Sequence, residues 1–219
     1  MTPERACLMF DLDGCLVDSL DSIAGCWATT LAEFGHAAPS VEQLRPFVGP
    51  PAAELVRHFV PDVDDATAGA IVAAYVRCAV AAHRAVQAFP GIPEALEALS
   101  DRGLILAVAT SKSVTVAEPL LERLGLRRWL ACVEGTHDDE LAADKATAVG
   151  RVLERLAPER TLGLVGDREH DVRGAHAHGI PAFGALWGYG SAPELRAAGA
   201  DDLLHAPAEL VGLVDRLTA

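Results

Sequence analysis

The apolar residues follow two different patterns along the chain. A short continuous apolar run at residues 6–10 is typical of a strand that is buried on both faces of a parallel sheet. Between residues 19 and 86 the apolar positions recur at helical spacing, with no convincing strand. From Phe89 onward, short apolar runs alternate with amphipathic stretches. The pattern therefore predicts one strand, then a helical segment, then alternating strands and helices.

Turn residues and helix caps divide the helical segment. Gly35 is a typical stop for a first helix, Ser40 offers a cap for the next, and Gly49-Pro50-Pro51 breaks the chain before a third. The predicted helices cover residues 19–34, a turn from residue 41, a stretch that ends near residue 61, and an alanine-rich stretch that follows Asp64 and Asp65 and reaches about residue 86.

The second part of the chain begins after residues 89–93, Phe-Pro-Gly-Ile-Pro. Its predicted strands are residues 104–109, 130–133, 161–165, 181–186 and 202–205, and its predicted helices are residues 93–100, 116–124, 144–156, 171–178, 192–198 and 207–217. Such alternation requires a parallel sheet that helices cover on both faces, and the first strand belongs to the same sheet. We therefore predict a Rossmann-like α/β core of residues 1–15 and 89–219, with residues 16–88 inserted as an all-helical cap domain.

Polar side chains stand at or just beyond the ends of the apolar runs. They are Asp11 and Asp13, then Thr110, Ser111 and Lys112, then Lys145, and finally Asp167 with Asp171. The carboxyl ends of parallel strands share one edge of the sheet, so these groups are expected to converge. Crowded carboxylates need a cation, hydroxyl groups suit phosphate oxygens, and a lysine adds a point charge. The pattern therefore favours a site for a metal ion and an anion, with one carboxylate placed to attack.

Composition narrows the classes of function. The chain has 219 residues, of which 51% are hydrophobic, and this is ample for a folded core. Its net charge of −13 argues against a surface that coats nucleic acid or binds an anionic membrane. The acidic start argues against a signal peptide, and no apolar run looks long enough to span a bilayer. The five cysteines are scattered, without a metal spacing or a disulfide framework, so we expect a soluble cytoplasmic protein.

Four motifs, in order along the chain, resemble those of phosphatases of the haloacid dehalogenase superfamily. They are Asp11-Leu-Asp13-Gly, Thr110, Lys145, and residues 166–171, Gly-Asp-Arg-Glu-His-Asp. The resemblance covers nearly the whole chain, because the family also has a helical cap after its first motif. Residues 166–171 and 186–190 look most similar to phosphoglycolate phosphatase and 5′-nucleotidase-like members. This resemblance implies a Mg²⁺-dependent hydrolysis of a small phosphomonoester that is similar to phosphoglycolate or to a nucleoside monophosphate.

The resemblance also implies roles for the carboxylates. Asp11 would be the nucleophile that forms an aspartyl-phosphate, and Asp13 would act first as general acid and then as general base. The side chains of Asp11 and Asp167 and the backbone carbonyl of Asp13 would hold Mg²⁺.

The remaining motif residues would bind and neutralise the phosphoryl group. The resemblance implies that Thr110, with Ser111 beside it, binds phosphate oxygens, and that Lys145 neutralises charge between the nucleophile and the phosphoryl group. Asp171 is expected to orient Lys145 or a metal-bound water. Cys15 departs from the family pattern, which usually has Thr there, and a thiol is a poorer hydrogen-bonding group than a hydroxyl.

Two alternatives of the same fold remain open. Related sugar phosphomutases hold a second phosphate with a basic residue in the cap loop, whereas residues 47–52 contain neither Lys nor Arg and Arg45 is the nearest. A non-catalytic regulatory protein would be expected to have lost a motif, and all four are present. A receiver-type phospho-acceptor would be far shorter, and a dehalogenase would need neither Asp13 nor Asp167.

The helical cap is expected to be a mobile lid, hinged near Val17 and residues 89–90, with the loop at residues 49–51 as its specificity element. We predict Lys112 as a turn or surface charge, with a supporting electrostatic role as the alternative. His170 is expected to be exposed or to support the site through a neighbouring residue. Trp187 and Tyr189 are expected to line the entrance or to pack on the cap or a partner. The expected partner is a small phosphorylated metabolite, not a nucleic acid polymer or a membrane. Neither the substrate nor the choice between monomer and homodimer follows from the sequence.

Overall fold

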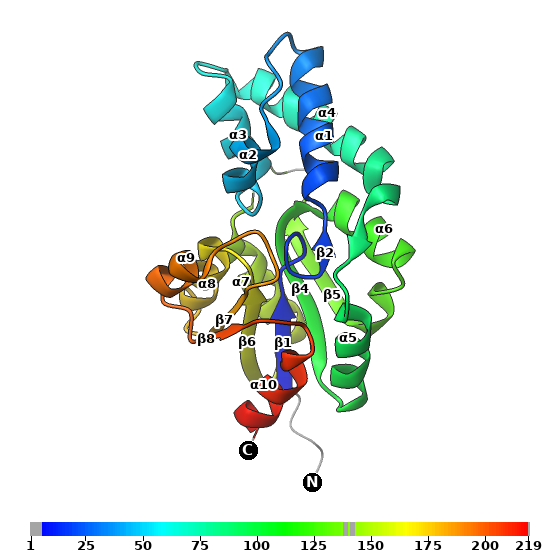
Figure 1. Cartoon of the computed structure of the whole chain (residues 1–219), viewed down its shortest axis with the longest axis vertical. Helices are drawn as coiled ribbons and strands as arrows, with labels where there is room; N and C mark the ends of the chain where they lie inside the picture. The colour runs from blue at the N-terminus through cyan, green and yellow to red at the C-terminus, as the bar shows by residue number, and fades with distance from the viewer. Residues whose placement is uncertain (1–5, 138–139, 141–142, 219) are drawn as a thin grey trace.

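The computed structural model describes residues 6–137, 140 and 143–218, and it shows a layered α/β part below a helical unit (Figure 1). Within the described residues, six strands form one parallel sheet in the order β5-β4-β1-β6-β7-β8. The strands are β1 (Ala6–Phe10), β4 (Ile105–Ser113), β5 (Leu130–Thr136), β6 (Arg160–Gly166), β7 (Ala182–Ala185) and β8 (Asp202–Leu204). The predicted α/β fold with a parallel, Rossmann-like sheet is confirmed.

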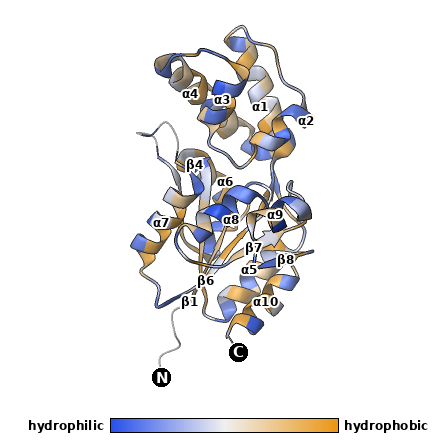
Figure 2. Cartoon of the chain, turned by 90° about the vertical axis from the view of Figure 1, so that its left-hand side faces the viewer, coloured by the Kyte–Doolittle hydropathy of each residue, from blue (hydrophilic) through white to orange (hydrophobic). Residues whose placement is uncertain are grey.

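Successive side chains of β1 point to opposite faces of the sheet, and each face has its own helices. Leu8 and Phe10 pack with α5 (Ile92–Asp101), α6 (Val114–Arg123) and α10 (Glu209–Thr218). Cys7 and Met9 pack with α7 (Lys145–Leu156), α8 (Glu169–His176) and α9 (Ala192–Ala198). Figure 2 shows hydrophobic colour along the central strands, as expected for a sheet that is buried on both faces.

The helical unit has a core of its own. It contains α1 (Leu20–Glu33), α2 (Val41–Leu44), α3 (Ala52–Phe59) and α4 (Asp65–Ala82), which meet in a cluster that includes Trp27, Leu31 and Ile71. The predicted cap at Ser40 is present, because its side chain accepts the N–H of Gln43. The unit stands above the carboxyl edge of the sheet, at the end opposite the two termini (Figure 1).

The chain enters and leaves the helical unit through two short strands that the sequence pattern did not predict. β2 (Val17–Asp18) and β3 (Gln87–Ala88) pair antiparallel. A strand of two residues is too short to leave a periodic pattern. Its existence depends on the two crossings lying side by side, which is a property of the folded chain.

The sheet strands extend further than their apolar runs. β4 continues through Thr110 to Ser113, and β5 continues to Thr136, where the two strands still pair. The predicted strands ended at the first polar residues, because the prediction relied on hydropathy, which marks only the buried part of a strand. Beyond Ala109 the pairing of β4 with β5 is irregular and resumes at Ser113, so the register of these polar residues does not follow from the apolar run.

One described helix, Asp65–Ala85 with a mean hydropathy of 1.3, is long and apolar enough by composition to cross a membrane. The expectation that no run reaches this length is therefore wrong. Such a helix by itself is weak evidence for a membrane protein, because core helices of soluble proteins reach the same values. Here α4 contacts α1, α3 and α6.

Candidate active site

The ends of β1, β4 and β6 bring the predicted site residues together at one edge of the sheet. Asp11 follows β1, and its backbone N–H donates to the Val165 carbonyl of β6 at 2.8 Å. Thr110 lies near the end of β4, and Asp167 follows β6. All three site residues are buried. Parallel pairing places these positions side by side although they are far apart in the sequence.

Lys145 begins α7, and its ammonium group lies between two carboxylates. Nζ is 2.5 Å from Asp11 Oδ1 and 2.8 Å from Asp171 Oδ1, and it donates to the Ala109 carbonyl at 3.0 Å. Burial would lower the pKa of Lys145, but the two carboxylates outweigh burial and raise that pKa above its usual range. Gly174 of α8 makes room for this side chain, since a Cβ there would lie 2.5 Å from Lys145 Cγ.

Two donors hold Asp13 in place. Ser19 Oγ donates to Asp13 Oδ1 at 2.6 Å, and Lys112 Nζ lies 3.0 and 2.9 Å from the two carboxylate oxygens. The Lys112 side chain is only 9% exposed, so the prediction of a turn or surface charge is wrong, and the alternative of a supporting charge agrees with its contacts. Lys112 lies in β4 beyond the apolar run, in the stretch between Ala109 and Ser113 where the pairing with β5 is irregular. The apolar pattern of the sequence did not show that the strand reaches this far.

Among the described residues, Asp11, Asp167 and Asp171 could hold a metal ion, because one oxygen of each lies within 4.8 Å of the others. Asp167 Oδ1 is buried and has no hydrogen-bond partner in the described part of the chain. Burial, followed by the charge of Asp171, raises the pKa of Asp11 to about 7 and that of Asp167 well above its usual range. When all four carboxyl groups, with Asp13 included, are ionised, the two lysines leave an excess of two negative charges. A divalent ion that prefers oxygen ligands, such as Mg²⁺, fits this donor set.

Glycine residues allow the loops to close around Asp167. Gly14 has a φ of +86°, and a Cβ on it would lie 2.3 Å from Asp167 Oδ2. The same oxygen accepts the backbone N–H of Tyr189 at 2.7 Å. The glycine of the first motif is therefore required both by its backbone conformation and by the close approach of the carboxylate.

A cavity of about 540 Å³ lies over these groups and reaches into the helical unit. Its lining includes Asp11, Asp13, Thr110, Ser111 and Lys112. Ser111 Oγ is buried and has no hydrogen-bond partner among the described residues. An unpaired buried hydroxyl is costly unless a ligand pairs with it, and it suits a phosphate oxygen.

The thiol of Cys15 is fully buried and donates to the Val165 carbonyl at 3.4 Å. Burial, together with the surrounding carboxylates, raises its pKa well above the usual range, so it stays a neutral thiol. Trp187 Nε1 donates to the Cys15 carbonyl at 2.9 Å. Cys15 thus packs the first motif against β6, and Trp187 packs on the same loop.

Tyr189 connects the loop after β7 to the start of the helical unit. Its hydroxyl accepts the N–H groups of Ser19 and Leu20 at 2.6 and 3.0 Å and donates to Asp18 Oδ1 at 3.0 Å. Unpaired N–H groups at a helix start need such an acceptor. The predicted packing of Tyr189 on the cap is therefore present.

Arg168 makes a second connection, which the sequence pattern did not reveal. Its guanidinium donates to the carbonyls of Arg45 and Val48, at 3.1 and 2.6 Å, and pairs with Glu194 at 2.7 Å. Gly49 lies against it, since a Cβ there would be 3.3 Å from Arg168 Cγ. The residue after Asp167 thus holds the loop before α3.

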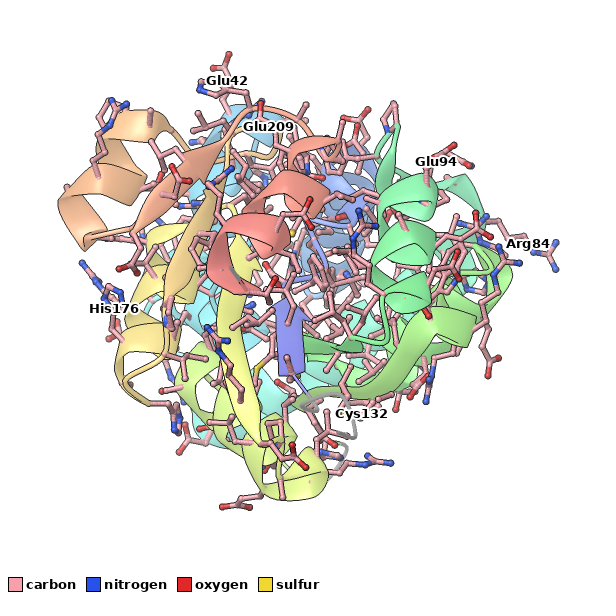
Figure 3. The ribbon with its side chains drawn as sticks, turned by 90° about the horizontal axis from the view of Figure 1, so that it is seen from below. Glu42, Arg84, Glu94, Cys132, His176 and Glu209 are labelled. Atoms are coloured by element: carbon pink, nitrogen blue, oxygen red, sulfur yellow. The ribbon has the colours of Figure 1, made fainter. Side chains whose placement is uncertain are left out.

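The histidines near the fourth motif lie apart from the carboxylate cluster. His176 and His178 are exposed, and His176 lies at the outer edge of the molecule (Figure 3). Their rings contact Asp201 and the Ala146 carbonyl, respectively. His170 is half-buried.

The sequence matches the family model described as haloacid dehalogenase-like hydrolase over residues 8–185. This match covers most of the chain. The protein therefore belongs to the haloacid dehalogenase-like hydrolase family, as its four motifs predicted.

Curated relatives and solved structures agree with this assignment. A 5′-nucleotidase of Pseudomonas aeruginosa is 36% identical over 195 residues, which is 87% of this chain and 86% of that protein. A phosphoglycolate phosphatase of Pseudomonas syringae pv. syringae is 32% identical over 189 residues, covering 83% of this chain and 70% of that protein. A predicted phosphatase from Clostridium acetobutylicum has a TM-score of 0.89 and 29% identity, over 97% of this chain and 99% of that one. The expected enzyme class, a phosphoric monoester hydrolase, is confirmed.

Proposed function

We propose that this protein is a Mg²⁺-dependent phosphatase that hydrolyses a small phosphomonoester through an aspartyl-phosphate on Asp11. The observation that carries the proposal is the position of Asp11, buried at the floor of the cavity and 2.5 Å from Lys145. A buried ammonium group lets an anionic nucleophile and an anionic phosphoryl group approach each other. Relatives of this chain named 5′-nucleotidase and phosphoglycolate phosphatase support a small phosphorylated substrate.

In the first step, the Asp11 carboxylate attacks phosphorus, and the bond from phosphorus to the substrate oxygen breaks. Asp13 gives its proton to the leaving alkoxide. Lys112 pairs with Asp13 and also lines the cavity, so its charge can be shared with an incoming phosphate. The hydroxyl groups of Thr110 and Ser111 are placed to hold the phosphoryl oxygens.

In the second step, Asp13 takes a proton from water as that water attacks the phosphorus of the aspartyl-phosphate. The bond between phosphorus and the Asp11 oxygen breaks, which restores the carboxylate and releases phosphate. Asp11, Asp167 and the backbone carbonyl of Asp13, with Asp171 nearby, would hold Mg²⁺, which would neutralise charge at the phosphoryl group. The helical unit, residues 16–88, serves as a lid that limits the access of water.

The sugar phosphomutase alternative receives less support from this site. Arg45 is exposed and contributes its backbone carbonyl to Arg168, while residues 47–52 have no basic side chain. A cytoplasmic setting agrees with cysteines that are all free thiols. The four intact motifs favour an enzyme over a regulatory protein on the same scaffold.

Trapping the intermediate tests the proposal. The enzyme with Asp13→Asn, mixed with Mg²⁺ and a ³²P-labelled aryl phosphate whose leaving group departs without a proton, and then quenched in acid, should retain label on the peptide that contains Asp11. Asp11→Asn should abolish turnover, by about 10⁴-fold or more, while circular dichroism shows a folded protein. Label on another peptide, or full turnover by Asp11→Asn, would contradict the assignment of the nucleophile.

A further inference from the structure

The cavity is larger than a two-carbon leaving group requires. Its volume of about 540 Å³ lies in the range of sites that hold drug-sized ligands. The reacting groups Asp11, Asp13, Thr110 and Lys112 account for one end of the lining. The remaining lining residues come mainly from the helical unit, so they face the alcohol that departs rather than the phosphoryl group.

Apolar side chains form this part of the lining. They are supplied by α1, the segment before α3, α4 and α6: Ile23, Trp27, Phe47, Val72, Val76 and Val116. Trp27 stacks on Tyr75, with ring centroids 4.0 Å apart and planes 8° apart, so the aromatic surface is rigid. A rigid apolar wall favours a ligand group that loses water when it binds.

The cavity also accounts for the incomplete burial of α4. Val72 and Val76 are half-buried and Ala73 is exposed, although the helix is strongly apolar. All three residues line the cavity. An apolar ligand group would complete the burial of this helix face.

The charges of the lining do not suit a carboxylate close to the phosphoester. Lys112 is paired with Asp13, and the His137 ring lies 3.3 Å from Glu134. Arg77 is exposed on α4. A short carboxylated alcohol would therefore place its carboxylate against apolar side chains. Among the described residues, the lining has no buried, unpaired cation to receive it.

We infer that the alcohol released from the substrate is bulky and largely apolar, and that the wall formed by α1 and α4 selects it over short carboxylated alcohols. The inference rests on the proposed phosphatase function and names the substrate class of the same site. It disfavours phosphoglycolate as the preferred substrate. A nucleoside monophosphate meets the requirement only through the apolar contacts of its base.

A homologous series of substrates tests this inference. With Mg²⁺, kcat/KM should rise by about fourfold for each added methylene from ethyl to butyl to hexyl phosphate, because each buried methylene contributes a similar gain in binding. Phosphoglycolate should react no better than ethyl phosphate. A flat or falling series, or a preference for phosphoglycolate over hexyl phosphate, overturns the inference while leaving the phosphatase proposal intact. Absence of Mg²⁺-dependent hydrolysis of every ester overturns the phosphatase proposal itself.

A matched pair of variants tests the wall. Ala70 and Ala73 are both exposed on α4, but only Ala73 lines the cavity. Ala73→Asp should lower the ratio of kcat/KM for hexyl over ethyl phosphate by about tenfold or more, because a charge enters an apolar site. Ala70→Asp should leave this ratio unchanged. Equal ratios in the two variants would show that α4 does not select the leaving group.

Discussion

At the scale of single residues, the site depends on the pairing of each carboxylate with a donor or a cation. Lys145 forms an ion pair with Asp11. Lys112 forms an ion pair with Asp13, to which Ser19 also donates a hydrogen bond. Both ammonium groups are buried, so their charges are screened little by solvent. Their loss should change chemistry more than substrate binding.

Lys112→Met tests the assignment of Lys112 as a positioning residue. Asp13 would then keep only the Ser19 hydroxyl of its two donors, so its orientation for proton transfer would relax. We expect kcat to fall by roughly 10²-fold, with a smaller change in KM. Lys112→Arg should restore part of the rate, and thermal melting checks that both variants fold. An unchanged kcat in Lys112→Met would show that Asp13 does not need this partner.

Two cysteines that looked unrelated in the sequence meet between α1 and α4. Cys26 and Cys78 have sulfur atoms 2.7 Å apart. Oxidised glutathione should link them, since the two thiols pass two electrons and two protons to the oxidant and release two reduced glutathiones. Burial, followed by the contact with Cys78, raises the pKa of Cys26 to about 12, so the reaction should be slow at neutral pH and faster in base.

Peptide mass spectrometry would identify the Cys26–Cys78 link, and dithiothreitol should reverse it. The cross-link should stabilise the protein by about 2–4 kcal/mol, seen as a higher melting temperature. Cys78→Ser is the control, because it leaves Cys26 without its partner. If Cys26 and Cys132 resisted oxidation to the same extent, the prediction would be contradicted.

At the scale of elements, two side chains of the sheet domain hold the helical unit over the site. Tyr189 binds the start of α1, and Arg168 binds the loop before α3. The backbone N–H of Tyr189 donates to Asp167, and Arg168 follows Asp167 directly in the sequence. Occupation of the site and the position of the helical unit are therefore physically connected.

Arg168→Lys tests this connection. The variant keeps the charge but loses the guanidinium donors to the carbonyls of residues 45–48, which are worth about 1.5–3 kcal/mol each when charged. Hydrogen exchange of residues 45–49 should become at least tenfold faster, and KM should rise more than kcat falls. Arg173→Lys is the control on α8, the helix that follows Arg168; Arg173 is exposed and pairs with Glu169. Similar exchange in the two variants would refute a docking role for Arg168.

At the scale of the whole molecule, the buried excess of negative charge should limit stability until a cation binds. In the metal-free protein, stability should fall as pH rises from about 4 through 7. The pKa of Asp11 is raised to about 7 in the folded state, so in this range the folded state binds more protons than the unfolded state. A rise in pH therefore favours the unfolded state. Mg²⁺ reverses this, since it favours the ionised carboxylates.

Mg²⁺ at about 100 times its dissociation constant should stabilise the protein by about 2.7 kcal/mol, a rise in Tm of roughly 5–10 °C. The rise should be smaller at pH 5.5 than at pH 8, because protons compete for the same oxygens. Thermal melting with Mg²⁺, with chelator and with Asp167→Asn measures it. An equal rise at both pH values, or a full rise in Asp167→Asn, would contradict the predicted metal site.

The sequence by itself determined the parallel sheet, the helical segment and most of the site. Local apolar runs mark buried strands, and chemical groups at strand ends must share one edge, so Asp11, Thr110 and Asp167 could be brought together without coordinates. These inferences need only periodicity and the rules of parallel pairing. Lys145 begins a helix, so its place in the site depended on the family resemblance as well.

Only the tertiary structure decided the residues whose position depends on contacts between distant segments. Lys112 belongs to the site because β4 runs on past its apolar residues, through a stretch of irregular pairing with β5, and brings the ammonium group to Asp13. Tyr189, Arg168 and the pair Cys26–Cys78 acquire their partners where the sheet meets the helical unit or where two helices pack. The apolar cavity also depends on contacts between distant segments, because several helices share its wall. The pattern of each helix shows that one face is apolar but not what that face contacts. Long-range packing is not encoded in any local window of the sequence, and for this reason its consequences appear only in the folded chain.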